Sequence, residues 1–168
     1  MEELNFSDPV ADSFLNRVGE FCRDIERPDW NNAHAFIEAI HKILVRLYSY
    51  GLELSLVDLT KWYADILELE ENVRNIALQK IQRNTPSQYY WTALNQLEFD
   101  VPSTGTGDLI DVLFDMYKKL ILGITYFDKV DGYQEWAFWT LKIIFSNHWS
   151  DRCVSAVQVI HEYLTNKA

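Results

Sequence analysis

Apolar side chains recur at helical spacing through most of this sequence, and this periodicity constrains the fold more than any other feature. Near the N-terminus the apolar positions step by three or four residues and so fall on one face of a helix: Val10, Phe14, Val18, Phe21 and Ile25. No window alternates apolar and polar residues for more than a few positions, as a half-buried strand would. The sequence therefore predicts mainly helix and no real sheet.

Capping residues, glycines and prolines divide this pattern into separate helices. Pro9 follows a capping residue and predicts a first helix that runs to Pro28. Asn31 or Asn32 is expected to cap a second helix, and Gly51 is expected to end it, since glycine commonly follows the last helical residue.

Further helices are expected at roughly 57–67, 71–83, 107–128, 133–147 and 150–166. Thr106 is the expected cap of the long one. The stretch of about 95–106, with its S-T-G-T-G run, is expected to be an extended irregular loop. The prediction is an all-α, single-domain helical bundle of six or seven helices over residues 1–168.

Length and composition agree with a self-sufficient soluble domain. The 168 residues, of which 48% are hydrophobic, suffice for a buried core without a metal or a disulfide. The sequence does not start like a secretory signal, and it has no apolar run long enough to span a membrane. Cys22 and Cys153 lie inside helical patterns and are expected to be free buried thiols. We therefore expect a cytoplasmic protein without membrane association.

The net charge of the chain bears on whether nucleic acid is a partner. The sequence has 25 acidic and 15 basic residues, which gives a net charge of -10. Its lysines and arginines are scattered singly, whereas phosphate binding requires a concentrated basic face. We therefore expect no nucleic-acid partner.

Two segments of the C-terminal half resemble a bacterial protein family. Residues 107–120 read G-D-L-I-D-V-L-F-D-M-Y-K-K-L, and residues 145–156 read F-S-N-H-W-S-D-R-C-V-S-A. They are similar to the patterns D-D-L-x-D-I-Y-x-D-L-K and F-x-x-H-W-G-x-H of the family called domain of unknown function 5063. The resemblance implies a helical fold and names no activity. The matching positions are Asp108, Asp111, Asp115, Phe145, His148 and Trp149.

The three aspartates fall on one side of their predicted helix, opposite its apolar face. Lys118 and Lys119 follow Asp115 by three and four residues, which is typical of a solvated ion-pair face. The alternative is a polar cluster with a neighbouring helix, in which an aspartate contacts a side chain near the start of the last helix. The candidate polar cluster is Asp108, Asp111, Asp115, His148 and Arg152.

Metal binding is not expected from these residues. The family pattern would place two imidazoles one helical turn apart, a spacing that chelates a metal ion. Arg152 stands at the second of these positions, where the family has histidine, and a permanent cation repels a metal ion. Glu38 and His41 form an E-x-x-H motif, which di-metal proteins use in pairs, but the sequence has no second copy. Glu38, His41 and the neighbouring His34 are therefore expected to form a surface cluster. We expect no cofactor and no stoichiometric metal.

Aromatic residues form the other candidate. Core packing is the expected role of most of them, and a pocket or a dimer surface is the alternative. The candidate aromatic surface consists of Tyr89, Tyr90, Trp91 and Trp149.

Signatures of nucleophilic or phosphate chemistry are missing from the sequence, which has no G-x-S-x-G and no glycine-rich phosphate loop. The favoured function is therefore binding of an unidentified protein partner, or of a second copy of the chain, without catalysis. Two alternatives remain: a helical metal-dependent enzyme that uses the Asp/His cluster, and an acidic inhibitor or immunity-type protein that masks a basic partner.

Overall fold

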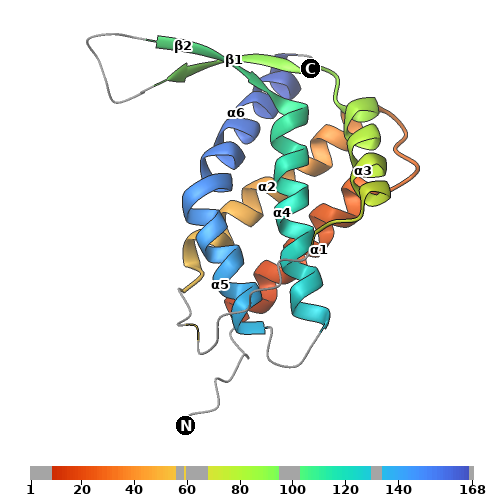
Figure 1. Cartoon of the computed structure of the whole chain (residues 1–168). Coiled ribbons are helices and arrows are strands. Elements are labelled where there is room, and N and C mark those ends of the chain that lie inside the picture. The colour runs from red at the N-terminus through yellow and green to blue at the C-terminus, as the bar shows by residue number, and fades with distance from the viewer. Residues whose placement is uncertain (1–8, 56–58, 60–67, 95–102, 130–133, 167–168) are drawn as a thin grey trace.

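The computed structural model describes residues 9–55, 59, 68–94, 103–129 and 134–166, and within these ranges the chain is mainly helical (Figure 1). The helices are α1 (Pro9–Glu26), α2 (Ala33–Glu53), α3 (Glu71–Asn84), α4 (Leu109–Lys129), α5 (Gln134–Ile144) and α6 (Ser150–Asn166). A π-helical turn, η1 (Phe145–Trp149), lies between α5 and α6. Two strands, β1 (Tyr89–Leu94) and β2 (Ser103–Asp108), form an antiparallel pair. The predicted helical character is confirmed.

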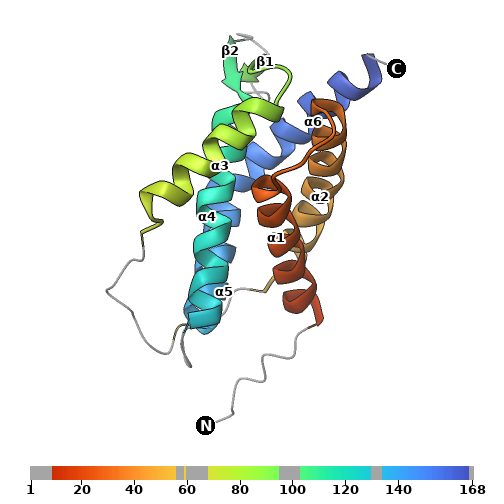
Figure 2. The ribbon, with the colours of Figure 1, turned by 90° about the vertical axis from the view of Figure 1, so that its right-hand side faces the viewer.

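The inward faces of the helices share one core. In α1 the apolar stripe is buried as its spacing predicts, and Phe14, Val18 and Phe21 are fully covered. Helix α1 packs against α2 and α4, and α2 packs against α6. Figure 2 shows α3 lying across the side formed by α1 and α4. Among the described helices, none combines the length and the apolar character needed to cross a membrane.

The expectation of no real sheet needs one correction: the S-T-G-T-G run, expected to belong to an irregular loop, forms β2 of a two-stranded sheet. Figure 1 shows the strand pair at the end of the bundle where α4 begins. The pairing register places Tyr89 opposite Asp108 and Trp91 opposite Thr106. A side chain at Gly107 would overlap the ring of Tyr90, so glycine allows Tyr90 to cross over β2. Strand pairing, rather than local propensity, therefore orders this run.

Helix α2 begins as predicted but ends later. The Asn32 side chain accepts the backbone N–H of Ala35 at 2.8 Å and caps the helix. Gly51, the expected end, lies inside the helix, which continues to Glu53. A Cβ atom on Gly51 would lie 2.5 Å from the ring of Phe145. This glycine therefore permits close packing between α2 and the π turn.

The expected break between two final helices is absent. The backbone N–H of Ser150 bonds to the carbonyl of Phe145, five residues back, so that α5, η1 and α6 form one continuous rod. The described residues therefore form five helical rods, fewer than the six or seven expected. The helix expected at about 57–67 lies outside the described residues except for Leu59.

Candidate functional site

Asp108 ends β2 and caps α4. Its Oδ1 accepts the backbone N–H of Ile110 at 2.9 Å and that of Asp111 at 3.1 Å. Its Oδ2 accepts a hydrogen bond from the Gln88 side chain at 2.8 Å. These bonds satisfy donors of the first helical turn and place a negative charge at its positive end. The cap is therefore Asp108 and not Thr106, which is exposed on the strand pair.

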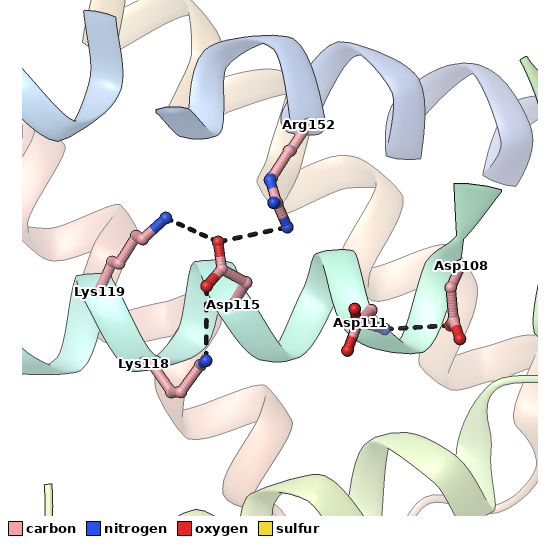
Figure 3. Close-up of polar contacts among 6 residues, drawn as sticks. All are labelled: Asp108, Asp111, Asp115, Lys118, Lys119 and Arg152. Atoms are coloured by element: carbon pink, nitrogen blue, oxygen red, sulfur yellow. Dashed lines mark hydrogen bonds and ion pairs between the residues drawn. The ribbon is translucent and has the colours of Figure 1, made fainter. Parts of the chain in front are cut away.

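Asp115, further along α4, is surrounded by three cations (Figure 3). Its Oδ2 lies 2.7 Å from Nζ of Lys119 and 3.3 Å from Nη1 of Arg152. Its Oδ1 lies 3.4 Å from Nζ of Lys118. The lysines belong to α4 itself, as their spacing predicts, whereas Arg152 approaches from α6. The structure therefore contains both the ion-pair face and one contact between helices.

These cations determine the ionisation of Asp115. Partial burial alone would raise the pKa of its carboxyl group. The hydrogen bond and charge of Lys119, and the charges of Arg152 and Lys118, outweigh burial and hold the pKa of Asp115 below its ordinary value. A carboxylate held ionised by three cations is a weak general base and a weak ligand for a metal ion. The arrangement around Asp115 is therefore that of a structural ion-pair network.

The rest of the candidate polar cluster is dispersed. Asp111 is exposed on α4, and His148 is exposed on the π turn. Within the described part of the chain, no hydrogen bond or ion pair connects His148 to the aspartates. The same ranges contain no group of three His, Cys, Asp or Glu side chains that could hold a metal ion. Of the proposed contacts between helices, the described residues form the one between Asp115 and Arg152.

The four residues of the candidate aromatic surface separate into two environments. Trp149 is fully buried, stacked on Phe14 at a centroid distance of 6.2 Å and edge-on to Phe145 at 4.7 Å. Its assignment to the surface is wrong, because the π turn directs the indole into the core. Tyr89 and Trp91, by contrast, are 63% and 78% exposed.

Alternation along β1 explains which aromatic rings face solvent. Tyr89 and Trp91 share one face of the strand, and the exposed Thr104 and Thr106 lie on the same face of β2. We call these four residues the outer face of the strand pair. Tyr90 lies on the opposite face and packs against the core. The sequence identified the aromatic cluster, but only the alternation of side chains along the strand shows which of its rings face solvent and which face the core.

A small groove separates β1 from α6. Its volume is about 90 Å³, and its lining consists of Tyr90, Trp91, Thr92, Ser155, Gln158, Val159 and Glu162. Burial raises the pKa of the Tyr90 phenol, although the charge of Arg152 and a hydrogen bond with Ser155 act to lower it. Sequence reasoning missed this groove. The four α6 residues of the lining lie on one face of the helix, as their spacing shows. From sequence alone that face would be predicted to be solvent-exposed, because nothing in the sequence shows that the strand pair lies beside it.

A larger groove of about 390 Å³ lies between α1 and α4. Apolar side chains, among them Leu15 and Phe127, line it together with Asp12 and Arg23. The two charged side chains are exposed and of opposite sign, so the groove favours neither an anion nor a cation. Its lining also contains no nucleophile and no buried acid or base.

Other reactive side chains have structural surroundings. The two cysteines are free and buried, as predicted, and burial raises the pKa of Cys153 to about 12. Such a thiol is not a nucleophile at neutral pH. Glu38 is exposed and pairs with Lys42 at 2.6 Å, while the ring of His41 lies 5.8 Å from that of His161. The single E-x-x-H motif therefore lies at the surface of α2.

The structure thus defines a mainly helical protein with a strand pair at one end of the bundle. The family model with the description "Domain of unknown function (DUF5063)" matches residues 6–166, so the chain belongs to this family. The crystal structure of protein BF1032 from Bacteroides fragilis has a similar fold, with a TM-score of 0.76, 16% identity, and coverage of 93% of this chain and 92% of that chain. No curated protein matches the chain. The resemblance seen in two motifs is confirmed over nearly the whole sequence.

Proposed function

We propose that this protein is a protein-binding module without catalytic activity, and that it contacts its partner through the outer face of the strand pair. The observation that supports this most directly is the exposure of Tyr89 and Trp91, at 63% and 78%, on the same face of one strand. Tryptophan and tyrosine dominate the binding energy of many protein interfaces. Their rings offer a large contact area at a small entropic cost.

The surroundings of the two rings suit such an interface. Thr104 and Thr106 place hydroxyl groups beside the aromatic side chains, which gives an apolar centre with polar neighbours. The strand pair also lies at one end of the bundle, where a partner would not compete with helix packing (Figure 1). Tyr89 and Trp91 gather two exposed aromatic rings on one face of the strand, and exposed apolar surface that is gathered in one place marks interaction sites, whereas single exposed residues do not.

The state of the potentially catalytic groups supports a role without chemistry. Asp108 caps a helix, Asp115 is ionised and paired with three cations, and Cys153 is a buried thiol. Each of these groups therefore has a structural use. The free thiols also favour the cytoplasm of a bacterium as the place where the protein acts, since disulfides are rare there.

A photocrosslinking experiment tests this proposal. A photoreactive amino acid at Thr104 would place the probe on the outer face while retaining both aromatic rings. We expect a crosslinked protein adduct in extracts of the source cells, and its loss when Trp91→Ala is added to the same chain. The control places the probe at Gln79, which is exposed on α3. An adduct that persists in Trp91→Ala, or that forms equally from position 79, would contradict the proposed surface.

A further inference from the structure

We propose that the groove between β1 and α6 binds a basic side chain, best an arginine, from the protein partner. This inference rests on the proposed function and specifies the chemistry of the contact. The partner segment would lie over the strand pair and insert one cationic side chain beside it. Two properties of the groove, its charge and its set of hydrogen-bond acceptors, support this choice of occupant.

The charge of the groove differs between its two ends. Of the α6 residues that line it, the first, Ser155, and the last, Glu162, lie seven positions apart, or roughly 10 Å along the helix. Glu162 is the one charged side chain of the lining and lies at one end. Arg152 lies one turn before Ser155, beyond the other end, and is already paired with Asp115. A bound cation is therefore directed to the Glu162 end, near the negative C-terminus of α6.

The acceptors near this end match a guanidinium group. Glu162 accepts a hydrogen bond of 3.3 Å from Gln158, and this is the one hydrogen bond of its carboxylate among the described residues. Oxygen atoms of Thr92, Ser155 and Gln158 belong to the same lining. A guanidinium carries five N–H donors in a planar fork, so it pairs with a carboxylate and with further acceptors at once.

The remaining lining residues suit the stem and the plane of an arginine. Tyr90, on the face of β1 that is turned toward the core, supplies aromatic surface on which a guanidinium group can stack, and Val159 supplies an apolar contact for the methylene stem. The volume of about 90 Å³ admits a slender side chain and excludes a folded element. A net charge of -10 would also attract a basic partner from a distance.

The experiment titrates the isotopically labelled full chain with a short capped peptide that contains a single arginine among glycines and serines. The readout is the movement of the Trp91 indole and of the backbone amides of residues 155–162 in NMR spectra. A peptide with citrulline in place of arginine is the matched control, because it keeps the shape and lacks the charge. We expect the citrulline peptide to bind at least about tenfold more weakly.

Three variants locate the contact. Glu162→Gln should weaken arginine-peptide binding by about tenfold, since it removes the one negative charge of the lining. Glu53→Gln, an exposed glutamate at the end of α2, should leave binding unchanged. Arg152→Gln should leave it unchanged or tighten it, because this change removes a repelling cation. Equal binding of the two peptides, full binding to Glu162→Gln, or spectral changes elsewhere would overturn the assignment.

This experiment is separable from the test of the proposed function. If the crosslink from Thr104 requires Trp91 but arginine peptides do not bind the groove, the outer face remains the interface and the groove assignment fails. If arginine peptides bind in the groove but no crosslink forms, the groove assignment stands and the outer face is not the interface.

Discussion

The π turn and the strand pair each contain a tryptophan, and the two side chains have opposite surroundings. Trp149 is fully buried between Phe14 and Phe145, whereas Trp91 is 78% exposed beside Tyr89. The same residue type therefore stabilises the fold in one region and remains available for contact in the other. The comparison teaches that the aromatic residues of this chain occupy two environments, which solvent exposure distinguishes and composition does not.

The largest expected effect tests this contrast directly. Trp149→Ala should reduce the free energy of unfolding by about 3–5 kcal/mol, because it leaves a cavity in a packed core. Trp91→Ala should change it by no more than about 0.5 kcal/mol, because the side chain buries little area. Denaturant titration of the two variants measures both values. Equal losses of stability would remove the distinction between the two regions.

The second prediction concerns the packing of α2 against the π turn. Gly51→Ala should destabilise the protein by about 1–3 kcal/mol, because the new Cβ atom would press on the ring of Phe145. Gly19→Ala in α1 is the matched control, since its Cβ atom would meet only the flexible end of Arg23 at 3.1 Å. Alanine there should stabilise the helix by up to about 1 kcal/mol. Thermal unfolding of both variants would show opposite shifts, and a stabilised Gly51→Ala would refute the packing argument.

A third change tests how the strand pair is joined to the bundle. Asp108→Ala should cost about 1 kcal/mol of unfolding free energy, because the first turn of α4 loses its cap. Asp108→Asn should retain most of this stability, because asparagine caps almost as well as aspartate. Chemical denaturation gives the free energies, and hydrogen exchange at the Ile110 amide reports the cap itself. Equal losses in the two variants would assign the effect to charge instead.

A smaller effect is expected where α6 leaves the π turn. Arg152 is 44% exposed and Asp115 is 19% exposed, so their attraction is reduced by solvent. A double-mutant cycle with Arg152→Ala and Asp115→Ala should give a coupling free energy of about 0.2–1 kcal/mol that decreases with added salt. The more exposed pair of Lys42 and Glu38 should show no measurable coupling. A coupling of about 3 kcal/mol would instead require a buried ion pair.

The smallest effect lies where α2 meets α6, away from both tryptophans. Partial burial lowers the pKa of His41, and the charges of His161 and Lys42 lower it further. The unfolded state therefore binds more protons between the folded and unfolded pKa values, so stability is complete above the unfolded pKa and decreases as the pH falls. His41→Gln should flatten this dependence in denaturant titrations from about pH 8 to about pH 5. An unchanged slope would show that His41 does not contribute.

Several elements could be predicted from sequence because their signals are local. The apolar spacing of α1, an asparagine cap at 31 or 32 and the range of α3 are confirmed, since each depends on residues within a few turns of one another. The aspartates of α4 were placed opposite its apolar face, and Asp111 is exposed as that placement requires. A contact between an aspartate of α4 and the start of the last helix was one of two alternatives, the other being a solvated ion-pair face. The distance and the exposure of the Arg152–Asp115 pair could not be predicted from sequence.

The errors involve pairs of segments that are distant in the sequence. Gly51 was expected to end a helix, and the helix continues because the glycine accommodates Phe145, far along the chain. Separate helices were expected at 133–147 and 150–166, but the π turn joins them, and Phe145 and Trp149 are both buried in the core. In the S-T-G-T-G run the two glycines disfavour a strand, and the run is ordered by pairing with β1.

The sequence alone determined that this protein is mainly helical, that its thiols are free, and that it resembles one family, because helical periodicity and short motifs are properties of neighbouring residues. Tertiary structure decided which tryptophan is buried, where Asp115 finds its third cation, and that a groove lies between β1 and α6. The physical reason is that burial, ion pairing across helices and groove shape depend on which surfaces meet. The contacts between these surfaces are fixed by packing of the whole chain and not by any one segment.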